Sequence, residues 1–215
     1  ERDISARNCE DTEMSTTASA AKPSALGSAP AKAGIILTTL ILGAMVANIN
    51  TSISNVALPS IASALNATDT ELTGITDAYQ LGIAATVLYL GAIGDRYGRK
   101  RMLLLGAFLC VPFSLLSAWS PTAVMLIGAQ IAVGVSGGML YPTTLSMITA
   151  LWRGRKLTAA IALWTGIGTG ASVLGPILGG WLLGNYWWGS VFLITVPLAL
   201  VVLALGFVVL PKSTQ

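Results

Sequence analysis

The sequence predicts an all-α integral membrane protein, built as a bundle of six membrane-spanning helices. The chain is 54% hydrophobic and only 10% charged, and its mean hydropathy of +0.75 lies outside the range of ordinary soluble domains. Residues 34–68, 102–152 and 157–211 contain no Asp, Glu, Lys or Arg. Because a helix needs about 20 apolar residues to cross a bilayer, these stretches have room for one, two and two spans. A further span fits between residues 73 and 94.

The predicted spans are residues 35–58, 74–94, 102–119, 122–148, 157–183 and 188–210 of a membrane domain that covers residues 34–215. We expect helices because a backbone inside the bilayer must satisfy its own hydrogen bonds, and because the alternating pattern of a membrane barrel is missing. Residues 1–33 are rich in polar residues, Ala, Ser and Pro, which predicts a disordered tail.

The basic residues predict the orientation of the bundle. All 12 Lys and Arg residues fall in the tail, in the loops around residues 96–101 and 153–156, or at Lys212. Since short cytoplasmic loops retain Lys and Arg, we expect a multi-pass protein of the cell membrane with both termini in the cytoplasm.

The stretch GAIGDRYGRKR, residues 91–101, concentrates five charged side chains in one short loop. Gly98 permits a tight turn and the basic residues anchor the loop in the cytoplasm. Neither role explains Asp95, which could pair with Arg99 or face the positive end of a neighbouring helix. Such a contact would latch two parts of the protein in one conformation.

This stretch resembles the loop signature between the second and third spans of the major facilitator superfamily. Three further stretches, NTSISNVALPSI (50–61), GVSGGMLYPTTLSMI (134–148) and LGPILGG (174–180), resemble first-, fourth- and fifth-span motifs of its 14-span drug:proton antiporters of the QacA and EmrB type. WGSVFLITVP (188–197) is similar, more loosely, to the start of the sixth span.

The resemblance implies two inverted three-helix repeats that form the amino-terminal half of an alternating-access transporter of the bacterial inner membrane. A missing carboxy-terminal half or a second copy would complete it, and we interpret the chain as a fragment in preference to a natural half. By the resemblance, a conformational-switch motif comprises Gly91, Asp95, Arg96, Gly98, Arg99 and Lys100. An antiporter motif that packs against the second half comprises Gly175, Pro176, Gly179 and Gly180.

Asp77 is the one ionisable residue inside a predicted span apart from Asp95, which lies eighteen residues, or about 27 Å of helix, further on. Polar groups held in a membrane are costly and often functional. Asp77 could titrate during proton coupling or balance a cationic substrate, as the acid at this position in QacA-like relatives implies. The alternative is an acid wetted at the outer interface.

Asn50 and Gln130 depart from the family pattern, which has an acid at the first position and an arginine at the second. Replacing both members of a buried ion pair avoids a stranded charge, so we expect the two amides to face each other at similar depth and to line the path of substrate and protons. The alternative is that each amide bonds separately to backbone or water.

Other classes of function find less support in the sequence. With no His, no Cys pair and no carboxylate pair inside the spans, we expect neither an enzyme nor a metal site, and no cofactor. The few basic residues suit a lipid bilayer better than nucleic acid. We therefore expect proton-coupled export of drugs or other hydrophobic cations. The alternatives are a membrane protein without transport activity and a transporter of one specific metabolite.

Overall fold

The computed structural model describes residues 32–210, apart from the side chains of residues 90–97. The predicted disordered tail falls almost entirely outside these residues. The described chain contains helices α2 (Ala33–Leu65), α3 (Asp69–Tyr97), α4 (Arg99–Ala118), α5 (Ala123–Leu151), α6 (Arg155–Asn185) and α7 (Thr195–Val209). A 3₁₀ segment, η1 (Trp188–Ile194), leads directly into α7.

Short turns with defined backbone geometry separate the helices. Asn66 ends α2 in the left-handed conformation, with a φ of 49°. Gly98 and Gly154 precede α4 and α6 with φ values of 95° and 59°, which favour glycine. Thr122 caps α5 by accepting a hydrogen bond from the backbone N–H of Met125 at 3.2 Å.

The first turn of α3 carries a capping box made by Thr68 and Glu71. The Glu71 carboxylate accepts hydrogen bonds from the Thr68 backbone N–H at 2.8 Å and from the Thr68 hydroxyl at 2.9 Å. The Thr68 hydroxyl in turn accepts one from the Glu71 backbone N–H at 3.3 Å. These bonds favour the charged carboxylate and therefore lower the pKa of Glu71.

We expect this box to be lost in acid. Because folding lowers the pKa of Glu71, its stabilising effect is complete above the unfolded value of about 4.3 and disappears as the pH falls through the lower, folded value. Hydrogen exchange of the Thr68 amide, followed by NMR in detergent, should show protection that declines in that range. Glu71→Gln should give weaker protection without this decline, and an unchanged pH profile in that variant would contradict the assignment.

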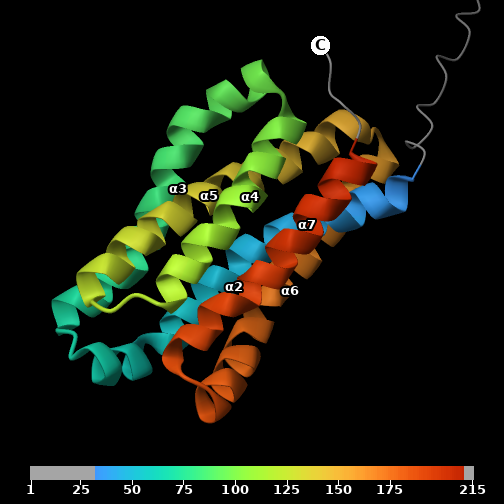
Figure 1. Cartoon of the computed structure of the whole chain (residues 1–215). Coiled ribbons are helices and arrows are strands. Elements are labelled where there is room, and N and C mark those ends of the chain that lie inside the picture. Colours follow the sequence, from blue (N-terminus) through green and yellow to red (C-terminus); the bar gives the residue numbers. More distant parts are fainter. Residues whose placement is uncertain (1–31, 211–215) are drawn as a thin grey trace, which may run out of the picture.

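The helices form two layers whose contacts repeat. Helices α4 and α7 pack against each other and lie in front of α5 and α2 in Figure 1. Helix α3 packs on α5 as α6 packs on α2, and α4 packs on α5 as α7 packs on α2. The contact pattern is therefore unchanged when α2, α3 and α4 exchange places with α5, α6 and α7, as two inverted repeats require.

Small residues bring the helices of each equivalent pair close together. A Cβ at Gly134 of α5 would collide with the Tyr79 carbonyl oxygen of α3, and one at Gly138 would lie 2.7 Å from the Thr86 Cβ. In the other repeat, a Cβ at Gly175 of α6 would lie 2.6 Å from Ser52 of α2. The Ser52 hydroxyl also donates to the Ser172 carbonyl at 2.7 Å. Both crossings thus use the small residues that drive helix association in membranes.

The core divides into two buried hydrophobic clusters along the bundle. The first includes Leu40, Leu103, Ile148, Trp164 and Val202. The second includes Ile53, Ile75, Leu126, Val191 and Phe192. The first lies toward the end of the bundle that carries Lys32 and the turns at Gly98 and Gly154, which we call the basic end. Figure 1 shows both ends of the described chain there.

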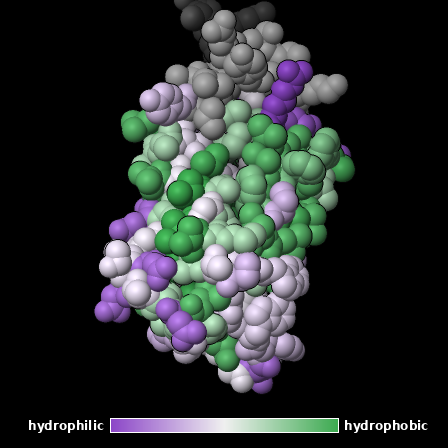
Figure 2. Space-filling model, turned by 60° about the vertical axis from the view of Figure 1, so that its left-hand side comes forward, coloured by the Kyte–Doolittle hydropathy of each residue, from purple (hydrophilic) through white to green (hydrophobic). Residues whose placement is uncertain are grey.

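Five helical segments of the described chain are long and apolar enough to cross a membrane, namely α2, α4, α5, α6 and η1 with α7. Figure 2 shows hydrophobic residues over the upper and central part of one face, with hydrophilic residues at its top edge, lower left and foot. The fold is thus the all-α membrane bundle that the sequence predicts. Helix α3 is not among the five, so its assignment as a span stays a prediction.

The helix that contains the first predicted span runs beyond it. The predicted span ends at residue 58, and α2 continues through Pro59 to Leu65. Pro59 is exposed, and Ile61 beyond it is fully buried in the second cluster. Burial of the following turn therefore outweighs the hydrogen bond that proline removes.

Candidate functional site

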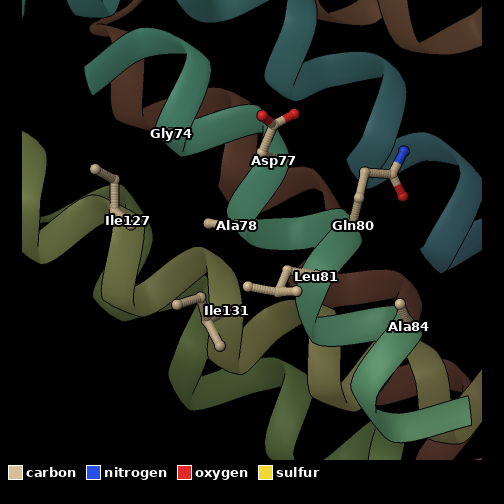
Figure 3. Close-up of a pocket in the computed structure, with 8 residues that line it drawn as sticks. All are labelled: Gly74, Asp77, Ala78, Gln80, Leu81, Ala84, Ile127 and Ile131. Carbon is tan, nitrogen blue, oxygen red and sulfur yellow. The ribbon is translucent and has the colours of Figure 1, made fainter. Parts of the chain in front are cut away.

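Asp77 lines an open groove between α3 and α5. The groove has a volume of about 510 Å³ and is bounded by Gly74, Asp77, Ala78, Gln80, Leu81, Ala84, Ile127 and Ile131. Figure 3 shows the Asp77 carboxylate and the Gln80 amide on the side of α3 that faces away from Ile127 and Ile131. Asp77 is exposed, and it is the one acidic residue beyond the first turn of α3 among those whose side chains the structure describes. The groove itself is therefore apolar, and the negative charge of Asp77 lies at its edge, on the side of α3 turned away from α5.

Asn50 and Gln130 are both buried, at 2% and 0% exposure, and neither lines the groove. The Asn50 side-chain oxygen accepts a weak hydrogen bond from the Ser54 hydroxyl at 3.4 Å. The side-chain nitrogen and oxygen of Gln130 are buried without any hydrogen-bond partner. The two amides, which were expected to face each other, therefore make no hydrogen bond to each other in this structure.

The register between α2 and α5 explains why the Asn50 and Gln130 amides do not meet. A Cβ at Gly43 would lie 3.0 Å from the Thr144 side chain, so these residues mark one level of two antiparallel helices. Asn50 lies seven residues from Gly43, whereas Gln130 lies fourteen residues from Thr144 toward the same end. At 1.5 Å per residue, Asn50 and Gln130 differ by about 10 Å along the bundle by this contact. The Tyr79 hydroxyl, which lies against both the Ala47 carbonyl and Gly137, gives a difference of about 6 Å. The two amides were expected at the same level because both lie about eight residues from the outer ends of the predicted spans.

The switch motif is described from Gly98 onward, and the side chains of Gly91, Asp95 and Arg96 lie outside the described residues. The Arg99 guanidinium donates to the Ser146 carbonyl of α5 at 3.1 Å. The Lys100 ammonium donates to the Phe207 carbonyl at 3.2 Å and also to that of Leu210. Lys100 thus binds the last carbonyls of α7, which lack helical partners, and Arg99 binds α5 five residues before its end. The dipoles of both helices favour positive charge near these ends.

The four residues of the antiporter motif divide between two faces of α6. Gly175 and Gly179 are buried against α2, where a Cβ at Gly179 would lie 3.5 Å from Val56. Pro176 and Gly180 are exposed, and a Cβ at Gly180 would meet nothing within 4 Å. Gly175 and Gly179 therefore pack within the bundle, whereas Pro176 and Gly180 lie on its surface.

Sequence reasoning missed two tyrosines whose roles depend on tertiary contacts. The fully buried Tyr79 of α3 donates its hydroxyl to the Ala47 carbonyl of α2 at 2.9 Å and so ties these helices together. Tyr141 of α5 is 38% exposed although it lies within a predicted span. A tyrosine amid apolar residues was the available signal, but hydropathy does not distinguish a buried tyrosine from an exposed one.

The fold and the groove together define a polytopic helical membrane protein with inverted repeats, an apolar groove with an acidic residue at its edge, and basic turns at one end. A family model, that of the Major Facilitator Superfamily, matches residues 40–215. The chain belongs to this superfamily.

Similarity to curated proteins extends over most of the chain. It is 40% identical over 187 residues to the multidrug efflux pump LfrA of Mycolicibacterium smegmatis, covering 86% of this chain and 37% of that protein. It is 38% identical over 180 residues to the methyl viologen resistance protein SmvA of Salmonella typhimurium, covering 83% and 36%. It is 31% identical over 175 residues to the methylenomycin A resistance protein of Streptomyces coelicolor, covering 81% and 37%. The chain thus spans little more than a third of the length of these relatives.

Proposed function

We propose that this chain is the amino-terminal bundle of a drug-efflux transporter that exports hydrophobic cations by alternating access, coupled to protons. The observation that carries the proposal is the exposed Asp77 carboxylate at the edge of an apolar groove. A negative charge beside a low-dielectric surface attracts a cation, and a carboxylate can exchange a substrate for a proton. The relatives named for multidrug efflux and methyl viologen resistance support the same class of substrate.

The remaining parts of the proposal concern the complete protein. A carboxy-terminal half, or a second copy of this bundle, would cover the exposed Pro176 and Gly180. The basic end, with both termini, would face the cytoplasm of the inner membrane, as the Lys and Arg content of short loops favours. The switch would use Asp95 and Arg96 beside the contacts of Arg99 and Lys100 with α5 and α7.

The proposed proton path involves fewer residues than the sequence suggested. Asn50 and Gln130 are buried away from the groove, so they would reach a substrate only if α2 and α5 moved. Asp77 is therefore the group that we propose for coupling.

Neutralising Asp77 tests the proposal. In cells that express the complete gene product, whose length is first measured by mass spectrometry, Asp77→Asn should reduce ethidium export at least tenfold at equal membrane abundance. Asp77→Glu should retain part of the activity, and a protonophore should abolish wild-type export. Asp69→Asn, which neutralises an exposed acid at the start of α3, is the matched control.

Two results would count against the proposal. Full export by Asp77→Asn would return Asp77 to the role of a wetted interfacial acid. A wild-type protein that exports neither ethidium nor other cations would favour a specific metabolite or no transport. The 29% identity to the riboflavin transporter RibZ of Clostridioides difficile makes a single-metabolite substrate the first alternative to assay.

A further inference from the structure

Tyr141 of α5, Trp164 of α6 and Thr144 of α5 contact one another. The Tyr141 ring centroid lies 4.9 Å from that of Trp164, with the ring planes inclined at 45°. Trp164 is buried, and its indole N–H donates to the Thr144 hydroxyl at 3.0 Å. That hydroxyl donates in turn to the Tyr141 carbonyl at 2.7 Å. The indole therefore supports one side of the phenol ring and is itself fixed in place.

The exposed part of Tyr141 lies deep in the bundle. Tyr141 precedes the end of α5 at Leu151 by ten residues, or about 15 Å. Its hydroxyl has no hydrogen-bond partner within the described chain, whereas the buried Tyr79 hydroxyl is bonded to Ala47. An unsatisfied hydroxyl is unfavourable against lipid, which offers it no hydrogen-bond partner. A hydrated or ligand-binding surface accounts for the exposed phenol better than lipid does.

The position of Tyr141 separates it from Asp77. A Cβ at Gly74 would lie 3.1 Å from Ile127, which sets the register of the parallel helices α3 and α5. Asp77 lies three residues beyond Gly74, and Tyr141 lies fourteen beyond Ile127. The two side chains are thus about 16 Å apart along the bundle. A small substrate cannot contact both at once, so Tyr141 would act as a second subsite.

We propose that Tyr141, supported by Trp164, is a stacking platform for the planar aromatic rings of substrates, and that it selects them over non-planar cations. The inference rests on the proposed transport function and adds a determinant of specificity. A flat ring covers the free side of the phenol over a large area and gains from offset stacking. A delocalised positive charge adds a cation–π attraction. A tetrahedral cation such as tetraphenylphosphonium gains less, because only one of its rings can lie flat on the phenol.

Binding measurements separate this platform from transport. The complete protein, reconstituted in lipid nanodiscs, is titrated with ethidium by fluorescence and with tetraphenylphosphonium by equilibrium dialysis. Tyr141→Leu should weaken ethidium binding about fivefold to tenfold and leave tetraphenylphosphonium within about twofold. Tyr141→Phe keeps the ring and should stay within about twofold for both ligands, which also shows that the site remains folded.

Phe108→Leu is the matched control, because Phe108 is an aromatic residue exposed in the middle of α4, in the other layer. It should change neither affinity. Equal weakening of both ligands by Tyr141→Leu, or no weakening of ethidium, would overturn the platform. If the wild-type protein binds tetraphenylphosphonium but not ethidium, the platform fails and the proposed function stands. If it binds neither, both fail.

Discussion

Gly134→Ala should destabilise the protein by about 2–3 kcal/mol, because it adds a methyl group where α3 and α5 cross. The added Cβ would collide with the Tyr79 carbonyl oxygen and lie 3.1 Å from the Gly82 Cα. Both neighbours are backbone atoms of α3, so no side chain can rotate away and the helices must separate. Separation would also strain the hydrogen bond from the Tyr79 hydroxyl to Ala47.

Gly128→Ala is the matched control on the same helix. A Cβ at Gly128 would meet nothing within 4 Å, and alanine favours a helix over glycine by up to about 1 kcal/mol. The free energy of unfolding is measured by titration with SDS, followed by tryptophan fluorescence. It should be lower than that of the wild type for Gly134→Ala and not lower for Gly128→Ala. Equal stability of the two variants would mean that α3 and α5 are further apart than the structure places them.

The helices of this fold could be predicted from hydropathy and charge because the bilayer imposes both. Stretches without charge located the segments that became α2, α4, α5, α6 and α7. Basic residues located the turns at Gly98 and Gly154, where positive φ values confirm the need for glycine. Hydropathy did not locate the end of α2, which runs past Pro59 to Leu65 with Ile61 fully buried.

The site could be predicted less well because it depends on register and on the direction of side chains. Asp77 was identified from its charge alone, and the structure shows that it lines the groove. The amides of Asn50 and Gln130 were placed at one level by counting from the ends of predicted spans, and α2 runs seven residues beyond its span, from residue 58 to Leu65. Tyr141 and Trp164, 23 residues apart in the sequence, carry no pattern that predicts their contact. Such pairings follow from the packing of α5 against α6, which hydropathy does not encode.

Gln130→Arg should destabilise the protein by about 3–5 kcal/mol, because it places an unpaired charge at a site with no exposed surface. Gln130→Met should instead stabilise it by about 1–3 kcal/mol, since the amide nitrogen and oxygen that it removes are buried without partners. The same unfolding titration measures both changes. The two substitutions thus act in opposite directions, although both side chains are long and unbranched at Cβ.

Adding Asn50→Asp to Gln130→Arg tests whether the positions face each other, as the acid and arginine of the family pattern suggest. Across about 6–10 Å at an effective dielectric constant near 20, an ion pair gains about 2–3 kcal/mol. The second substitution should therefore recover only part of the loss. Complete recovery would mean that the arginine side chain extends along the bundle to meet the carboxylate directly, so that the two positions do face each other. Partial recovery, together with the gain from Gln130→Met, would show that Gln130 keeps a polar group where stability alone would favour an apolar one. In a membrane bundle, that is the behaviour expected of a group retained for another step of the transport cycle.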